Sequence, residues 1–155
     1  MQEFPVQHAE LLVNLCTAGA DEAAREQVLT LAADECLRYE SSNQPGNRRA
    51  LTAATVGGVA LDAGALVTLG IGAANRDPAV YEQPGNLNLR REGNKHLAFG
   101  YGIHQCAGLS LTRREGRIAI GRILDRFPRF ELGAPPVRGG RARFRGFLSA
   151  PFSVT

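Results

Sequence analysis

The segment Phe99–Gly108, FGYGIHQCAG, places one of the chain's three cysteines in a loop that also contains three glycines. A cysteine kept for packing is expected among aliphatic residues of a helix or strand, whereas Cys106 has glycines and His104 as neighbours. Glycine lets the backbone adopt positive φ and approach a flat ligand closely. Cys106 also precedes a predicted helix that begins near Leu109, and amides at a helix N-terminus favour a thiolate. The segment therefore predicts a chemically active sulfur, as a nucleophile, a redox group or a metal ligand.

The composition is that of a globular, water-soluble protein: 155 residues, of which 44% are hydrophobic and 21% charged. This length favours a single domain over residues 1–155 with a moderate core. The net charge is +3, and arginine strongly outnumbers lysine, which occurs once, as Lys95. Arginine suits fixed contacts with carboxylates and phosphates, including the carboxylates of a cofactor.

The three cysteines, Cys16, Cys36 and Cys106, are far apart and odd in number, without CxxC spacing. This pattern disfavours a disulfide framework and favours a reducing cytoplasm. The N-terminal MQEFPVQHAE lacks the basic and apolar regions of a signal peptide. The uncharged run 63–75 is too short to span a bilayer. We therefore expect a cytoplasmic protein without a membrane contact, in which Cys16 and Cys36 serve packing.

Hydrophobic periodicity and turn residues divide the chain into helices, strands and a long irregular stretch. Residues 8–39 are predicted to form helix in two pieces separated near 17–20, and SSNQPGN at 41–47 ends that pattern. Two or three strands are predicted over 50–69, with a hairpin turn at Gly57-Gly58, and a short helix with turns over 72–84. An irregular segment over 86–108 is followed by a helix over 109–127. The chain is predicted to end in a C-terminal hairpin with Arg141, Arg143 and Arg145 on alternate positions.

The loop around Cys106 resembles the haem-binding loop of the cytochrome P450 family, FxxGx(H/R)xCxG. Phe99, Gly102, His104, Cys106 and Gly108 occupy the fixed positions of this signature. The resemblance implies that Cys106 is the axial thiolate on the iron of haem b, iron protoporphyrin IX. It also implies that His104 reaches a haem propionate and that Phe99 packs beside the sulfur.

Two upstream motifs match the same family in the right order. Glu35-Cys-Leu-Arg38 resembles the ExxR pair of the K helix, which is buried in the family, and Arg48 resembles a strand arginine that binds a haem propionate. Counting back from Gly58 favours Arg48 over Arg49. The resemblance runs from about residue 9 to the end and implies an α+β fold, mainly helical, with small sheets: the haem-side C-terminal part of a bacterial-type P450.

The family implies monooxygenation, in which one oxygen atom of O2 enters a small organic substrate. Two electrons come from a ferredoxin-type or flavoprotein donor, and the thiolate ligand favours O–O cleavage. By resemblance, Arg113, Arg114 and Arg117 lie near the proximal side and offer a basic dock for an acidic ferredoxin. The resemblance assigns no catalytic side chain to this chain beyond the cofactor-binding set.

The resemblance covers only the part of the family that begins near the J and K helices. The I helix, whose AGx(D/E)T segment delivers protons to bound oxygen, lies upstream in the family. Ala18-Gly-Ala-Asp21 imitates its beginning, but Glu22 replaces the threonine and Glu35 follows too closely, so we interpret it as a polar turn. We therefore expect weak haem binding at best, and little coupled oxygenation, from these residues alone.

A second departure concerns the segment that follows the short helix. Most family members have a PxRF-like sequence, whereas this chain has Pro84-Gly-Asn86-Leu87. Asn86 cannot supply the cation that would complete a network with Glu35 and Arg38. If that pair is buried, it must find another partner or remain partly unsatisfied, at a cost of about 1–3 kcal/mol.

Several alternatives remain open on the sequence alone. Glu35 and Arg38 could be an exposed i, i+3 pair, and His96 could be either a solvated loop residue or a functional one. A zinc site of His96, His104 and Cys106 lacks a fourth ligand. The tail RGGRARFR could bind single-stranded nucleic acid through charge and stacking, in a non-catalytic remnant, although one solvated strand face explains it better.

Overall fold

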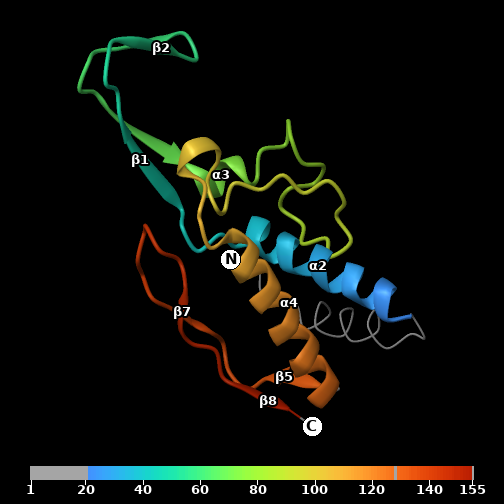
Figure 1. The fold of residues 1–155 in the computed structure, drawn as a ribbon. Coiled ribbons are helices and arrows are strands. Elements are labelled where there is room, and N and C mark those ends of the chain that lie inside the picture. Colours follow the sequence, from blue (N-terminus) through green and yellow to red (C-terminus); the bar gives the residue numbers. More distant parts are fainter. Residues whose placement is uncertain (1–20, 128, 155) are drawn as a thin grey trace.

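The computed structural model describes residues 21–127 and 129–154, apart from the side chains of Phe130 and Leu132. Two long helices, α2 (Glu22–Tyr39) and α4 (Leu109–Arg126), pack against each other in the body of the molecule (Figure 1). Among the described residues, no helix is long and apolar enough to cross a membrane. The predicted helical piece at 8–20, with His8 and Cys16, lies outside the described residues.

Local signals fix the ends of α2. Asp21 is the N-cap and its side chain accepts a hydrogen bond from the amide of Ala24 at 2.8 Å. Glu22 in the first turn and Arg38 in the last turn complement the helix dipole. The prediction that this helix ends at Tyr39 is confirmed.

The contact between the two helices forms the apolar core. Leu29 of α2 and Leu124 of α4 are buried, and Val28 and Ile120 pack against them. Gly121 permits the close approach, because a Cβ there would lie 3.2 Å from Cδ1 of Leu29. Of the periodic apolar residues that predicted the 109–127 helix, Ile120 and Leu124 lie in this contact, whereas Ile123 is 44% exposed.

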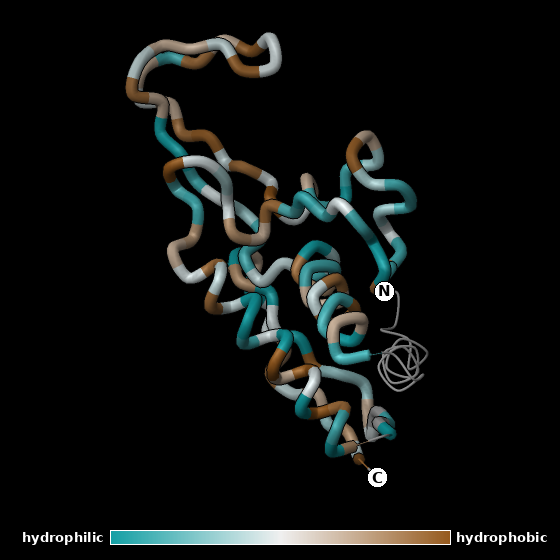
Figure 2. The backbone as a smooth tube through the Cα atoms, turned by 45° about the vertical axis from the view of Figure 1, so that its right-hand side comes forward, coloured by the Kyte–Doolittle hydropathy of each residue, from teal (hydrophilic) through white to brown (hydrophobic). Residues whose placement is uncertain are grey.

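The strands form two-stranded antiparallel ribbons. The pairs are β1 (Pro45–Arg49) with β4 (Leu66–Gly70), β2 (Ala54–Val56) with β3 (Val59–Leu61), β5 (Phe130–Leu132) with β8 (Phe152–Val154), and β6 (Val137–Arg138) with β7 (Phe147–Ser149). The predicted turn between β2 and β3 is confirmed, since Gly57 and Gly58 have φ of +57° and +82°. The β1–β4 ribbon extends away from the helices, and Figure 2 shows hydrophobic stretches along it.

The prediction that 41–47 is only a break was wrong in its second half, because β1 begins at Pro45. Proline is tolerated at the first position of a strand. The preceding segment is also paired with the distant C-terminal hairpin, since the amide of Gln44 donates to the carbonyl of Arg143 at 2.9 Å. Tertiary pairing thus overrides the turn-like composition.

The rest of the chain is arranged around these elements. A one-turn helix α3 (Ile71–Ala74) follows β4, as predicted. The segment up to α4 is irregular, as predicted, except for the 3-10 turn η1 (Gly102–His104). The C-terminal hairpin is present, but the alternation of Arg141, Arg143 and Arg145 along a strand was wrong, because all three lie in the connection between β6 and β7.

Candidate functional site

Main-chain hydrogen bonds hold the loop around Cys106 in place. The amide of Cys106 donates to the carbonyl of Phe99 at 2.8 Å, and the carbonyl of Cys106 accepts from the amide of Leu109 at 3.2 Å. Gly100 and Gly102 have φ of +73° and +69°, a conformation that strongly favours glycine. The cysteine is therefore positioned by the backbone on both sides, directly before α4.

The loop leaves its cysteine and the space beside one of its glycines open. Cys106 is exposed, and a Cβ on Gly102 would meet no atom within 4 Å. Ile103 is 97% exposed and Tyr101 82% exposed, so the loop also has uncovered apolar surface. A single accessible cysteine suits haem, whose iron takes its other ligands from the porphyrin and needs one protein sulfur, so the residues present fit haem.

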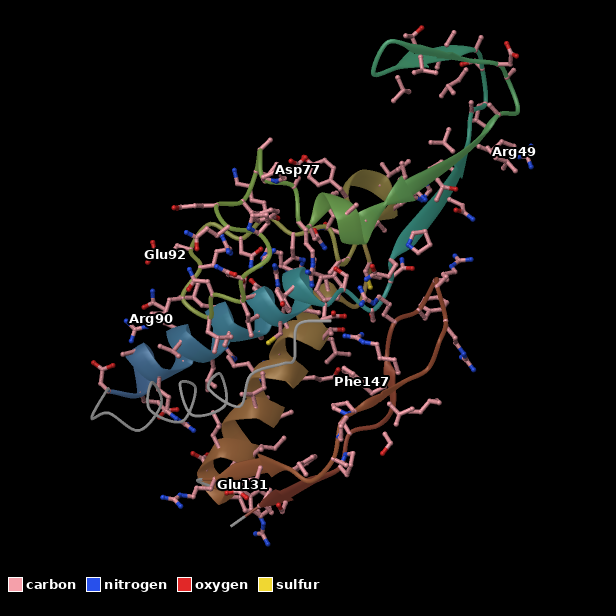
Figure 3. All side chains as sticks on the ribbon, turned by 180° about the vertical axis from the view of Figure 1, so that it is seen from behind. Arg49, Asp77, Arg90, Glu92, Glu131 and Phe147 are labelled. Atoms are coloured by element: carbon pink, nitrogen blue, oxygen red, sulfur yellow. The ribbon has the colours of Figure 1, made fainter. Side chains whose placement is uncertain are left out.

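His104 and Arg48 are both exposed, His104 at the end of η1 and Arg48 in β1. Figures 1 and 3 show η1 beside α3 and the β1–β4 ribbon. The Arg48 guanidinium donates to the carbonyl of Asn47 at 2.9 Å. Arg49 instead donates to the carbonyl of Gly64 at 2.8 Å, and Figure 3 shows it on the outer side of the ribbon.

Glu35 and Arg38 of α2 are almost completely buried, at 0% and 1% exposure. Arg38 makes a bidentate ion pair with Glu35, with both N–O distances at 2.8 Å. The other guanidinium hydrogens go to the carbonyl oxygens of Asn75, Pro84 and Asn86, at 2.8, 3.0 and 3.1 Å. The pair is not an exposed i, i+3 contact, and it attaches the irregular segment to α2.

Arg91 supplies the second cation to Glu35. Its Nε lies 3.1 Å from Oε2 of Glu35, and the Arg91 side chain is 11% exposed. Glu35 also accepts from the amide of Asn88 at 2.8 Å and from Nδ2 of Asn94 at 3.1 Å. The pair therefore finds another partner, as the sequence required, while Asn86 contributes only its carbonyl.

Sequence reasoning missed Arg91. The signal was the Arg90-Arg91 pair in an otherwise irregular segment, but nothing in it distinguishes one arginine from the other. In the structure, the side chain of Arg91 faces Glu35, whereas Figure 3 shows Arg90 and Glu92 at the outer edge.

The start of the loop is held by a second buried group, Asn75, which sequence reasoning also missed. Its Oδ1 accepts from the amide of Leu97 at 2.7 Å, and its Nδ2 donates to Oγ of Ser41 at 2.6 Å. Ser41 in turn donates to the carbonyl of Leu37 at 2.9 Å. Asn75 thus connects α2 to the residues just before Phe99.

His96 is buried and joins α2 to the loop. Its Nδ1 accepts from the amide of Ala98 at 3.3 Å, and its Nε2 faces Oδ1 of Asp34 at 3.5 Å. The ring also lies 5.7 Å from the ring of Phe99. His96 is therefore not a solvated loop residue, and both ring nitrogens have protein partners. Among the described side chains, no group of three or more metal-ligating residues could hold an ion.

The Asp34 carboxylate lies between two side chains from different parts of the fold, His96 and Arg113. The Arg113 guanidinium of α4 donates to it at 2.8 Å, opposite His96. Burial raises the pKa of Asp34, but the hydrogen bonds from His96 and Arg113 and the charge of Arg113 outweigh it, so the pKa lies below its usual value. The carboxylate therefore stays charged and links α2, α4 and the loop.

The two described cysteines have different environments. Burial, together with the nearby charge of Glu35, raises the pKa of Cys36 to about 11. Cys36 is thus held as a neutral thiol, which agrees with a packing role, whereas Cys106 is exposed.

The arginines near the start of α4 line a shallow hollow of about 300 Å³, together with Thr30 and Ser110. Arg113 pairs with Asp34 and Arg117 with Glu26, both on α2. Arg114 is exposed. The three residues predicted as a basic dock are therefore brought to one face.

Comparison with known proteins agrees with this arrangement. The family description that matches residues 21–138 is "Cytochrome P450". The chain is 40% identical over 133 residues to the polyketide biosynthesis cytochrome P450 PksS of Bacillus subtilis, covering 83% of this chain and 33% of that protein. It is 43% identical over 122 residues to cytochrome P450 105C1 of a Streptomyces species, covering 78% and 31%.

Solved structures show the same relationship. P450BioI, crystallised with an acyl carrier protein ligated to hexadec-9Z-enoic acid, has a TM-score of 0.86 and 35% identity, covering 97% of this chain and 37% of that chain. The chain spans about a third of the length of the curated relatives it matches. The predicted fold, an α+β part of a P450 with helices and small sheets, is confirmed. The chain belongs to the cytochrome P450 family.

Proposed function

We propose that this chain is the haem-side part of a bacterial haem-thiolate monooxygenase, with Cys106 as the axial ligand to the iron of haem b. The observation that carries the proposal is the exposed Cys106, fixed by main-chain bonds in a glycine loop at the start of α4. The coverage of about a third of the relatives supports treating residues 1–155 as one partial domain.

The residues that would hold the haem come from three elements. Cys106 would bind the iron, Phe99 would pack beside its sulfur, and Gly102 and Gly108 would leave room for the porphyrin. His104 and Arg48 would each reach a propionate, which suits their positive or protonatable side chains and their exposure. When bound, the haem supplies the oxygen-activating chemistry of the family.

A second set of residues would position the loop that holds the haem. The Glu35–Arg38 pair and Arg91 hold the irregular segment on α2, and Asn75 fixes the start of the loop. His96 supports the ring of Phe99. These groups act by positioning, because they are attached to the loop or to the segment that leads into it.

The electron donor would be a ferredoxin-type or flavoprotein partner that docks on the face with Arg113, Arg114 and Arg117. Complementary charge mainly accelerates the encounter of two proteins. In a complex with haem, charge reversal at Arg114 should slow electron transfer without changing the haem spectrum. Arg114 is the informative site because its exposed side chain has no ion pair with α2 among the described residues.

The proposal is tested by adding haem to the full chain, reducing it and adding carbon monoxide. A strongly red-shifted Soret band is expected for thiolate ligation, and it should be lost in Cys106→Ser. Cys36→Ala is the matched control, because it removes the other described cysteine and should leave the band in place. An unchanged band in Cys106→Ser would reject Cys106 as the ligand. No haem uptake, combined with salt-sensitive RNA binding, would instead favour the non-catalytic alternative.

A further inference from the structure

A second hollow, distant in sequence from the cysteine loop, lies between the C-terminal hairpin and the segment that leads into β1. It has a volume of about 310 Å³ and is lined by Gln44 and by Arg138, Arg141 and Arg145, with small residues between them. Figures 1 and 3 show this hairpin beside the start of β1. We call these lining residues the arginine hollow.

The walls of the arginine hollow are fixed by backbone pairing. The amide of Arg145 donates to the carbonyl of Ser42 at 2.7 Å, and the amide of Gln44 donates to the carbonyl of Arg143 at 2.9 Å. Across the hairpin, the amide of Gly139 donates to the carbonyl of Gly146 at 3.0 Å. The arginine side chains therefore project from a backbone that is held on both sides.

The charges in the arginine hollow are unbalanced. Glu40 forms ion pairs with Arg138 at 3.1 Å, with Arg145 at 3.5 Å and with Arg76 at 3.8 Å. The Arg138 guanidinium is also held 4.7 Å from the ring of Phe147. Among the described residues, no other carboxylate pairs with Arg138 or Arg145, and Glu40 also shares its single negative charge with Arg76, which lies outside the hollow.

Arg141 is the third guanidinium that lines the arginine hollow, beside those of Arg138 and Arg145. It is exposed and forms no hydrogen bond or ion pair with any described residue. All of its donors are therefore available, and Arg145 is held to Glu40 only by a long contact. An arginine fork binds carboxylate or phosphate oxygens in a bidentate manner.

We propose that the arginine hollow binds a small organic dianion, a phosphate monoester or a dicarboxylate. Two negative charges would offset the excess of guanidinium groups better than one. The volume exceeds that of a single phosphate and lies at the lower end of small-molecule sites. This site goes beyond the proposed monooxygenase function and does not depend on haem binding.

The geometry disfavours single-stranded nucleic acid as the ligand. Arg141, Arg143 and Arg145 do not follow one strand face, and the Arg143 guanidinium lies over the ring of Phe144 at 5.5 Å. Arg145 is directed toward Glu40. Nucleic-acid sites of this type instead need a groove that follows the phosphate backbone, with aromatic rings free for stacking.

The test is calorimetric titration of the full chain, at fixed ionic strength, with phenyl phosphate, with succinate and with a single-stranded oligonucleotide. Saturable one-to-one binding of phenyl phosphate or succinate is expected, and the tighter of the two identifies the acid group. Arg141→Ala should raise the dissociation constant at least tenfold. Arg122→Ala is the matched control, because it removes an exposed arginine of α4 outside the hollow.

Glu40→Gln should lower the dissociation constant of the dianion, whereas Arg141→Ala should raise it. It removes the competing carboxylate and frees the forks of Arg138 and Arg145, so the dianion should bind several-fold more tightly. The proposal is overturned if neither dianion binds, if Arg141→Ala and Arg122→Ala weaken binding equally, or if only the oligonucleotide binds. Arg141→Ala keeps the test decisive even if Glu40→Gln perturbs the fold.

Discussion

Removing the Arg91 side chain should destabilise the protein far more than removing that of its neighbour Arg90. Arg91→Ala deletes a charge-assisted hydrogen bond to the fully buried Glu35, and such a bond contributes about 1.5–3 kcal/mol. It also deletes the bond from Nη1 to the carbonyl of Glu82, which is exposed and contributes little. Glu35 keeps its bidentate pair with Arg38, so the charge is not left alone. We expect a loss of about 2–3 kcal/mol in the free energy of unfolding.

The assay is urea unfolding of the full chain, followed by far-UV circular dichroism. Arg90→Ala is the control, since its exposed side chain predicts a change within about 0.5 kcal/mol. The unfolding slope m should be the same for both variants, so that the midpoint alone reports stability. Equal midpoints for the two variants would show that Arg91 is not the second cation of Glu35, and the account of the irregular segment would then be wrong.

Three further predictions concern other parts of the structure. Iodoacetamide at pH 8 should modify the exposed Cys106 much faster than Cys36, whose thiol stays neutral with a pKa of about 11; peptide mass mapping gives both rates. Because the folded pKa of Asp34 lies below its usual value, this carboxylate stabilises the fold above about pH 4 and loses that contribution as the pH falls through its folded pKa. Asp34→Asn should therefore flatten the acid limb of a stability–pH curve, and an unchanged limb would contradict the ion pair. Gly116→Ala should raise the melting temperature, since helix propensity improves by up to about 1 kcal/mol and the nearest side-chain atom is 4.0 Å away. Gly121→Ala should be less favourable, because its Cβ would lie 3.2 Å from Leu29; a larger gain at Gly121 would contradict the close helix contact.

The sequence predicted the features whose causes are local. The 109–127 helix followed from its periodicity, and the β2–β3 turn from two adjacent glycines that adopt positive φ. The loop around Cys106 was identified because its motif fixes many positions within ten residues. In each case, neighbouring residues carry the whole signal.

The features that sequence reasoning missed depend on distant partners. β1 starts at Pro45 inside a turn-like segment, next to residues that pair with the C-terminal hairpin. Arg91 was missed because only the position of Glu35, far upstream, distinguishes it from Arg90. Arg145 was expected on a strand face, but it lies in the connection between β6 and β7 and is drawn toward Glu40.

Cys106 is held by main-chain hydrogen bonds, and this affects how the loop around it can evolve. Since amide and carbonyl groups set the location of the sulfur, the side chains of Gln105 and Ala107 need not hold it there. Substitutions at these two positions can alter the surroundings of the sulfur while its anchoring point stays fixed. The chemical environment of the sulfur can therefore change during evolution without a change in the backbone that positions it.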